Sequence, residues 1–129
     1  MTEAEILELI QLAYSNSLAS FAIFLTIVAA YLVAAFQAGA KLRFSELVIV
    51  NTLFVVMSSI SIFTTSAFGL TGHNLTAELA EIDPSTNRYD HPLLLVLFGI
   101  AEVASVLACL WFMQGRRRGK NSESTSQGT

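Results

Sequence analysis

The sequence predicts an all-α integral membrane protein with three transmembrane helices. Of its 129 residues, 53% are hydrophobic and only 13% are charged, whereas a soluble domain of this size carries about 25% charged residues. Three long apolar runs contain a single ionisable side chain other than Cys and Tyr, namely Glu102 in the third run. Each run has roughly the 20 residues that a helix needs to cross a hydrocarbon core. We therefore expect transmembrane helices at residues 17–38, 47–70 and 93–113.

The N-terminal residues 1–16 are expected to form an amphipathic helical segment. Thr2 and Glu5 have the spacing of a capping box, which predicts a helix start at the N-terminus. Apolar residues recur at helical spacing from Ile6 onwards, with glutamates between them, which is typical of a segment that lies in, or leads into, the outer interface. A helix continuous with the first span would exceed the bilayer, so it would either project outward or bend at residues 15–17.

The ends of the first two spans carry helix signals of their own. Gly39 is a plausible end for the first helix, and residues 39–46 then form a short loop. Ser45 is a plausible N-cap for the second helix, because its hydroxyl can accept a hydrogen bond from a free backbone N–H.

The outer loop and the tail are expected to differ in structure. Within the loop, residues 71–92, we expect a short helix at about 75–82, which Pro84 would end. Asp90 is a plausible N-cap for the third span. The tail, residues 114–129, is basic at its start and then rich in Ser, Gly, Gln, Asn and Thr, so we expect its end to be disordered.

The charges on the connecting segments predict the orientation of the chain. Basic residues dominate the loop 39–46 and the tail 114–129, whereas acidic residues dominate the N-terminal segment and the loop 71–92. Lys and Arg near span ends are retained on the cytoplasmic side. We therefore expect the N-terminus outside and the tail in the cytoplasm, with a bacterial inner (plasma) membrane as the location. The expected topology anchors are Lys41, Arg43, Arg116, Arg117 and Arg118.

Small and polar residues predict which helix faces pack, since hydrophobicity does not distinguish lipid from protein. The first span has a row at steps of four residues, with larger residues such as Phe24 mostly outside it. The third span has small residues on one face and branched residues on the other. The expected packing faces are Ala22, Thr26, Ala30, Ala34 and Ala38 in the first span, and Ala101, Ser105, Ala108 and Cys109 in the third.

The second span has a seven-residue polar repeat. Asn51-Thr52, Ser58-Ser59 and Thr65-Ser66 are polar pairs that stay on one side of the helix. Such a repeat favours left-handed packing against a neighbouring helix. Serine and threonine hydroxyls can bond to carbonyls of their own turn, so we expect Asn51 to be the residue that bonds to another helix.

Glu102 is the main candidate for a functional residue, as a protonatable group near the membrane midplane. No Lys or Arg lies in any span to pair with it, so we expect the neutral acid at pH 7. Two hypotheses follow. Glu102 either forms hydrogen bonds that set the register of the helices or join protomers, or it is a site on an ion or proton path. Its expected polar neighbours are Thr26, Asn51, Ser58, Ser59 and Ser105.

No enzyme motif is present, and we expect neither enzymatic activity nor a cofactor. The sequence contains no phosphate loop, no HExxH and no recognisable Ser-His-Asp set. His73 and His91 are weak candidates for metal ligands, but their spacing matches no ligand pattern, so we expect no metal site.

The function that these features favour is that of a small, non-enzymatic, multi-pass protein acting as a homo-oligomer or as an accessory subunit of a larger membrane complex. The alternative is an ion-, proton- or solute-conducting oligomer, channel-like or holin-like, with Glu102 on its path. The layout of three spans, an outer N-terminus and a basic inner tail resembles that of class I phage holins. The expected partners are the lipid bilayer and other membrane proteins, and not nucleic acid; the sequence does not identify a small-molecule ligand.

Overall fold

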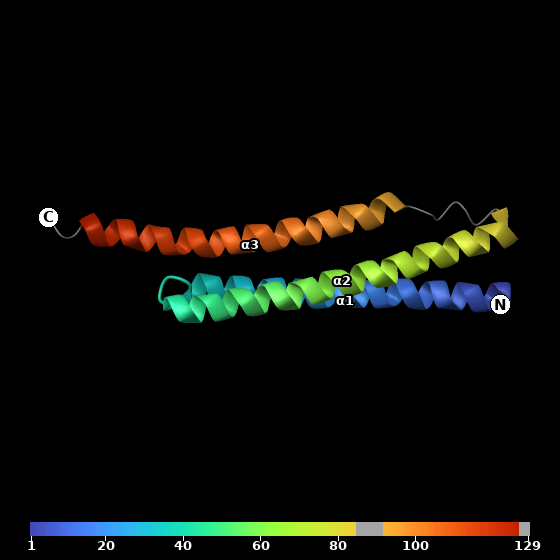
Figure 1. Cartoon of the computed structure of the whole chain (residues 1–129), viewed down its shortest axis with the longest axis horizontal. Coiled ribbons are helices and arrows are strands. Elements are labelled where there is room, and N and C mark those ends of the chain that lie inside the picture. The colour runs from blue at the N-terminus through green and yellow to red at the C-terminus, as the bar shows by residue number, and fades with distance from the viewer. Residues whose placement is uncertain (85–91, 127–129) are drawn as a thin grey trace.

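The computed structural model describes residues 1–84 and 92–126, and this part of the chain consists of three long α-helices. They are α1 (Glu3–Ala38), α2 (Phe44–Ile82) and α3 (Pro92–Ser126). Helices α1 and α2 form an antiparallel hairpin, and α3 lies along it but is shifted, so that its C-terminal end extends past the α1–α2 turn (Figure 1). All three helices are long and apolar enough to cross a membrane.

Helices α1 and α2 are both much longer than one membrane crossing. The predicted capping box is present, because the Thr2 N–H donates to Glu5 Oε2 at 2.6 Å and the Glu5 N–H donates to Thr2 Oγ1 at 3.4 Å. From this cap α1 continues without a break through residues 15–17 for 36 residues. At 1.5 Å per residue its length is about 54 Å, against about 30 Å for a hydrocarbon core. The N-terminal segment and the first span are thus one helix.

The boundaries of α2 correct two predictions. The helix begins at Phe44 rather than after Ser45, and the Arg43 N–H donates to Glu46 Oε2 at 2.8 Å. The separate short helix at 75–82 does not form, since these residues continue α2 up to Ile82. No proline separates them from the span, and Gly72 and Asn74 do not interrupt the helix, so it propagates at one hydrogen bond per added residue.

Two further boundaries concern the ends of α1 and α3. Helix α1 ends with Gly39 as its C-cap, as predicted, and the Gly39 N–H donates to the Ala35 carbonyl. The expected disorder of the tail is wrong up to Ser126, because α3 continues to that residue. After Pro92 the chain contains no proline that would end the helix. Asp90, the predicted N-cap of the third span, lies outside the described residues.

The α1–α2 hairpin packs through residues seven positions apart. The predicted polar repeat of α2 is confirmed only in part, because Ser58 and Thr65 are buried whereas the second member of each pair is exposed. In α1 the row of four-residue steps is wrong, since Ala22, Thr26 and Ala30 are exposed. Left-handed packing keeps a seven-residue repeat at the contact, while a four-residue step drifts around the helix. The buried residues in the repeat are Ile6, Ala13, Ser20, Phe24 and Tyr31 on α1, and Leu47, Phe54, Ser58, Ser61, Thr65, Gly72 and Leu79 on α2.

Helix α3 contacts the hairpin through a narrower face, and its contacts with α1 and α2 are far less extensive than those between α1 and α2. Glu102, Cys109 and Met113 are its buried residues. The predicted outward face is confirmed, since Val103 and Leu107 are 50% and 62% exposed. The predicted small face is only partly correct, because its alanines are exposed and Cys109 is the member that is buried.

Candidate functional site

The two ends of the bundle differ in charge. Lys41 and Arg43 lie at the α1–α2 turn, and Arg116 of α3 reaches the same end. The Arg116 Nη2 donates to the Phe36 carbonyl at 3.1 Å, and its guanidinium lies 5.0 Å from the centroid of the Phe36 ring. The structure therefore brings three of the five predicted topology anchors together, and Arg117 and Arg118 follow in the same helix. Glutamates gather at the opposite end, on the first turns of α1 and the last turns of α2.

Glu102 lies on the buried face of α3 and is only 1% exposed. Neither of its carboxyl oxygens has a hydrogen-bond partner among residues 1–84 and 92–126. A buried polar group without a partner carries a penalty of about 1–3 kcal/mol, and more when it is charged. A carboxyl group in this position therefore needs either its own proton or a ligand.

A cavity of about 40 Å³ lies beside Glu102, where all three helices meet. Its polar lining comes from Ser17 on α1, Thr65 and Ser66 on α2, and Glu102 itself. Phe21 and Phe98 also line it, with their rings packed edge to face at a centroid distance of 5.2 Å. The site is a small cavity with mainly apolar walls, whose polar part is formed by Glu102 and the three hydroxyl residues.

Two of the three hydroxyl groups that line this cavity, those of Ser17 and Thr65, donate their protons to backbone carbonyls. The Ser17 hydroxyl donates to the Thr65 carbonyl at 3.0 Å, and the Thr65 hydroxyl donates to the Ser61 carbonyl at 2.9 Å. Thr65 lies close to the Glu102 carboxyl, but it makes no hydrogen bond to it because its proton points to Ser61. The oxygens of Ser17 and Thr65 therefore offer lone pairs, and no proton, to the cavity.

None of the predicted polar neighbours of Glu102 lines this cavity. The hydroxyls of Thr26, Ser59 and Ser105 each donate to the carbonyl four residues earlier in their own helix. Ser58 is buried, and its hydroxyl has no partner within the described part of the chain. Asn51 does bond across to another helix, as expected, because the Tyr31 hydroxyl donates to Asn51 Oδ1 at 2.7 Å.

Sequence reasoning missed the contribution of Ser17 to this cavity. Thr65 and Ser66 belong to the polar repeat of the second span, but Ser17 was assigned only to the start of the first. Ser17 lies seven residues before Phe24 and fourteen before Tyr31. A seven-residue repeat in α1, matching that in α2, was the signal that would have identified it.

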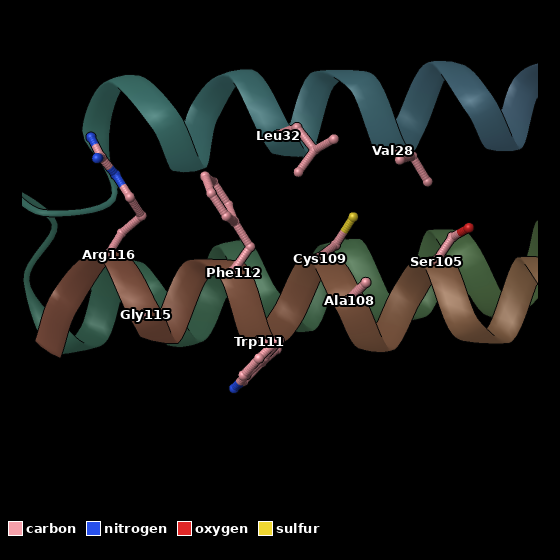
Figure 2. A pocket seen from close by; sticks show the side chains of 9 residues that line it. All are labelled: Val28, Leu32, Ser105, Ala108, Cys109, Trp111, Phe112, Gly115 and Arg116. Atoms are coloured by element: carbon pink, nitrogen blue, oxygen red, sulfur yellow. The ribbon is translucent and has the colours of Figure 1, made fainter.

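A larger, apolar groove begins about one turn beyond Glu102. It has a volume of about 650 Å³ and runs between α1 and α3 from Ser105 to Arg116 (Figure 2). Phe112 points into the space between the helices, whereas Trp111 turns away from α1 (Figure 2). Glu102 thus lies between the small cavity that it shares with Ser17 and Thr65 on one side and a wide apolar groove on the other.

The structure brings together no metal-binding group within residues 1–84 and 92–126, where no cluster of three or more His, Cys, Asp or Glu side chains occurs. His73 is part of α2, and His91 lies outside the described residues. Comparisons of the chain with models of protein families, with curated proteins and with solved structures yielded no match.

Proposed function

We propose that the chain is a multi-pass protein of a bacterial inner membrane, with its N-terminus outside and its basic tail in the cytoplasm. Only 22% of the most apolar stretch of α1 and of α2, and 11% of that of α3, is buried within the chain. Surface of this kind is stable against lipid tails and not against water. The gathering of Lys41, Arg43 and Arg116 at one end supports the orientation.

Single cysteines test this orientation. In a Cys109→Ala background, Glu8→Cys is expected to react with a membrane-impermeant maleimide in intact cells. Lys41→Cys is expected to react only after the membrane is opened. Labelling of both positions, or of position 41 alone, in intact cells contradicts the proposed orientation.

Within that membrane, the chain acts as a non-enzymatic homo-oligomer or as an accessory subunit of a larger membrane complex. The observation that supports this function is the exposed row of Ala22, Thr26 and Ala30 on α1, which the hairpin leaves uncovered. Small residues allow the backbones of neighbouring helices to approach closely, which is how helices associate in lipid.

The mass of the particle in a mild detergent tests this function. We expect a mass above 14.0 kDa of protein, as an oligomer or with a co-purifying membrane protein. Thr26→Leu is expected to weaken the assembly, whereas Leu25→Phe adds bulk to the exposed surface beside the row and is expected to preserve it. A strictly monomeric particle without a partner contradicts the proposal.

A second candidate function is conduction of ions, protons or a solute by an oligomer, channel-like or holin-like. The observation that favours it is the position of Glu102 between the small cavity and the apolar groove. Ionisable residues within membrane segments commonly mark ion or proton paths.

Flux into proteoliposomes under a pH gradient tests this second function. If Glu102 carries protons, Glu102→Gln and Glu102→Leu both abolish flux. If Glu102→Gln preserves assembly and flux while Glu102→Leu destroys both, the proton-carrying role fails and Glu102 is a hydrogen-bonding peg.

A further inference from the structure

We infer that the cavity beside Glu102 is a binding site for one monovalent cation, which competes with a proton for the Glu102 carboxylate. The inference deepens the second proposed function by naming the ligand of its central residue. It concerns binding and does not require that the ion passes through the membrane.

The cavity offers the ligand atoms that a small hard cation requires. The Glu102 oxygens have no hydrogen-bond partner, and the oxygens of Ser17 and Thr65 turn lone pairs inward, because their protons are donated to the Thr65 and Ser61 carbonyls. Carboxylate and neutral oxygen atoms are the ligands that hard cations prefer. These four oxygen atoms act as acceptors, which a cation or the proton of a neutral carboxyl would satisfy.

The charge of the surroundings selects a monovalent ion. The residues that α1 and α2 contribute to the cavity, namely Ser17, Leu18 and Phe21, and Thr65 and Ser66, carry no charged or titratable group. On α3, the nearest such group is Cys109, seven residues or about 10 Å further along the helix. One carboxylate and one monovalent cation give a neutral site, whereas a divalent cation would leave an uncompensated charge in an apolar environment.

The size of the cavity fits a single ion. A volume of about 40 Å³ holds one or two particles the size of water. Ser17 lies at the start of the predicted first span, and Glu102 lies near the middle of the third. The cavity therefore lies in the half of the membrane that we propose faces outward, and it is lined in part by Leu18 and Phe98.

Equilibrium binding of radioactive Na⁺ to the full chain in detergent tests the site. We expect saturable binding of one Na⁺ per chain at alkaline pH, and progressive loss of binding as protons compete at lower pH. Competition with unlabelled K⁺ and Li⁺ identifies the preferred ion, and competition by either one supports the site. Excess choline, which is too large for the cavity, is expected to leave Na⁺ binding unchanged.

Matched variants locate the binding. Glu102→Gln is expected to abolish it, while Glu8→Gln makes the same change on an exposed carboxylate and is expected to have no effect. Ser17→Ala is expected to weaken the affinity about tenfold, and Ser59→Ala, an exposed serine bonded within its own turn, is the control. Binding that survives Glu102→Gln overturns the inference.

Carbodiimide labelling keeps the inference falsifiable if Glu102→Gln does not fold. A carbodiimide that enters apolar sites reacts with the protonated Glu102 of the unmodified chain, and we expect Na⁺ to slow this reaction while choline does not. Labelling that is indifferent to every alkali cation, together with no saturable binding between pH 6 and 9, overturns the inference. Na⁺ binding without flux refutes conduction and leaves the site standing, whereas flux without binding refutes the site alone.

Discussion

The α1–α2 hairpin and helix α3 differ in their polar contacts, although each buries a polar side chain without a partner in the described part of the chain, namely the Ser58 hydroxyl on α2 and the Glu102 carboxyl on α3. Within the hairpin, hydrogen bonds cross from α1 to α2 at three levels, through Ser17, Ser61 and the Tyr31–Asn51 pair. The rings of Tyr31 and Phe54 also stack at a centroid distance of 3.9 Å. Against this, α3 faces the hairpin with an unpaired carboxyl, Glu102, and its one hydrogen bond to another helix in the described part is made by Arg116.

The difference indicates a division of roles between the two parts. The hairpin is stabilised by close packing and by hydrogen-bonded polar pairs at the contact between α1 and α2. Helix α3 leaves the small cavity at Glu102 and the wide groove beyond it, so its position is set by fewer contacts. A buried polar group without a hydrogen-bond partner lowers the folding stability. Within membrane segments, ionisable groups of this kind are common at sites of binding or reaction.

The largest effect on stability is expected from removal of the stacked ring in the hairpin. Phe54→Ala should destabilise the fold by about 2 kcal/mol, below the roughly 3–5 kcal/mol of aqueous cores, because lipid is as apolar as the site that the ring leaves. Reversible unfolding in a mixed-micelle titration measures it. Phe63→Ala, at a position 75% exposed, is the control, and equal effects at both positions would contradict the packing of the hairpin.

Replacement of Glu102 tests whether this residue contributes to cation binding or to the stability of the fold. Glu102→Leu should stabilise the fold by about 1 kcal/mol, because it removes a buried polar group that has no partner and leaves none behind. The same titration measures the gain, and cation binding should be lost. Destabilisation comparable to that of Phe54→Ala would show that Glu102 stabilises the packing of the helices.

The absence of a side chain at Gly69 leaves room for Leu95 of α3. A Cβ there would meet Leu95 Cδ1 of α3, so Gly69→Ala should push α3 outward at a cost of about 1 kcal/mol. Spin labels at the exposed positions 70 and 94 are expected to report a longer distance. Gly72→Ala places its Cβ 3.1 Å from the Tyr14 ring instead, and it should leave that distance unchanged. An equal response to both substitutions would contradict the packing of α3 on Gly69.

The smallest effect on stability is expected at the N-terminus of α1, where Thr2 and Glu5 form the capping box. Hydrogen bonds from the Thr2 N–H and hydroxyl lower the pKa of Glu5. Because the pKa is lower in the folded state, the cap is complete at neutral pH and is lost as the pH falls through that lowered pKa. Amide exchange in the first turn of α1 should then accelerate on acidification. Glu5→Gln should remove this dependence and Glu3→Gln should preserve it; exchange that does not respond to acid would contradict the capping box.

Several features of the fold were predictable from particular residues. The Thr2–Glu5 pair marked the start of α1, Gly39 marked its end, and the polar repeat through Asn51, Ser58 and Thr65 identified the seam of α2. The lengths of the helices were not predicted, because hydropathy reports where a helix is apolar and not where it stops. Polar residues at both ends of α2 continue a helix that the apolar run had already nucleated.

The candidate site was predictable only in its central residue. Glu102 stood out because a carboxylate is rare in an apolar run, but its partners did not. Thr26 and Ser59 were expected at about the same membrane depth as Glu102, but both are exposed. Ser17 lies closer to the N-terminus of α1 than Thr26, and it lines the cavity. The sequence indicates how deep a residue lies within its own membrane span. It does not indicate how each helix is rotated about its axis or how far it is shifted along the neighbouring helix.

The sequence by itself determined three apolar helices, the basic and acidic ends and the unusual carboxylate, because these depend on composition and on spacing along one chain. Only the tertiary structure decided that α3 is shifted past the α1–α2 turn and that Glu102 lines one cavity with Ser17 and Thr65. The physical reason is that lipid and protein interior are equally apolar. Hydrophobicity therefore does not select a helix face in this chain, and close packing between helices selects it instead.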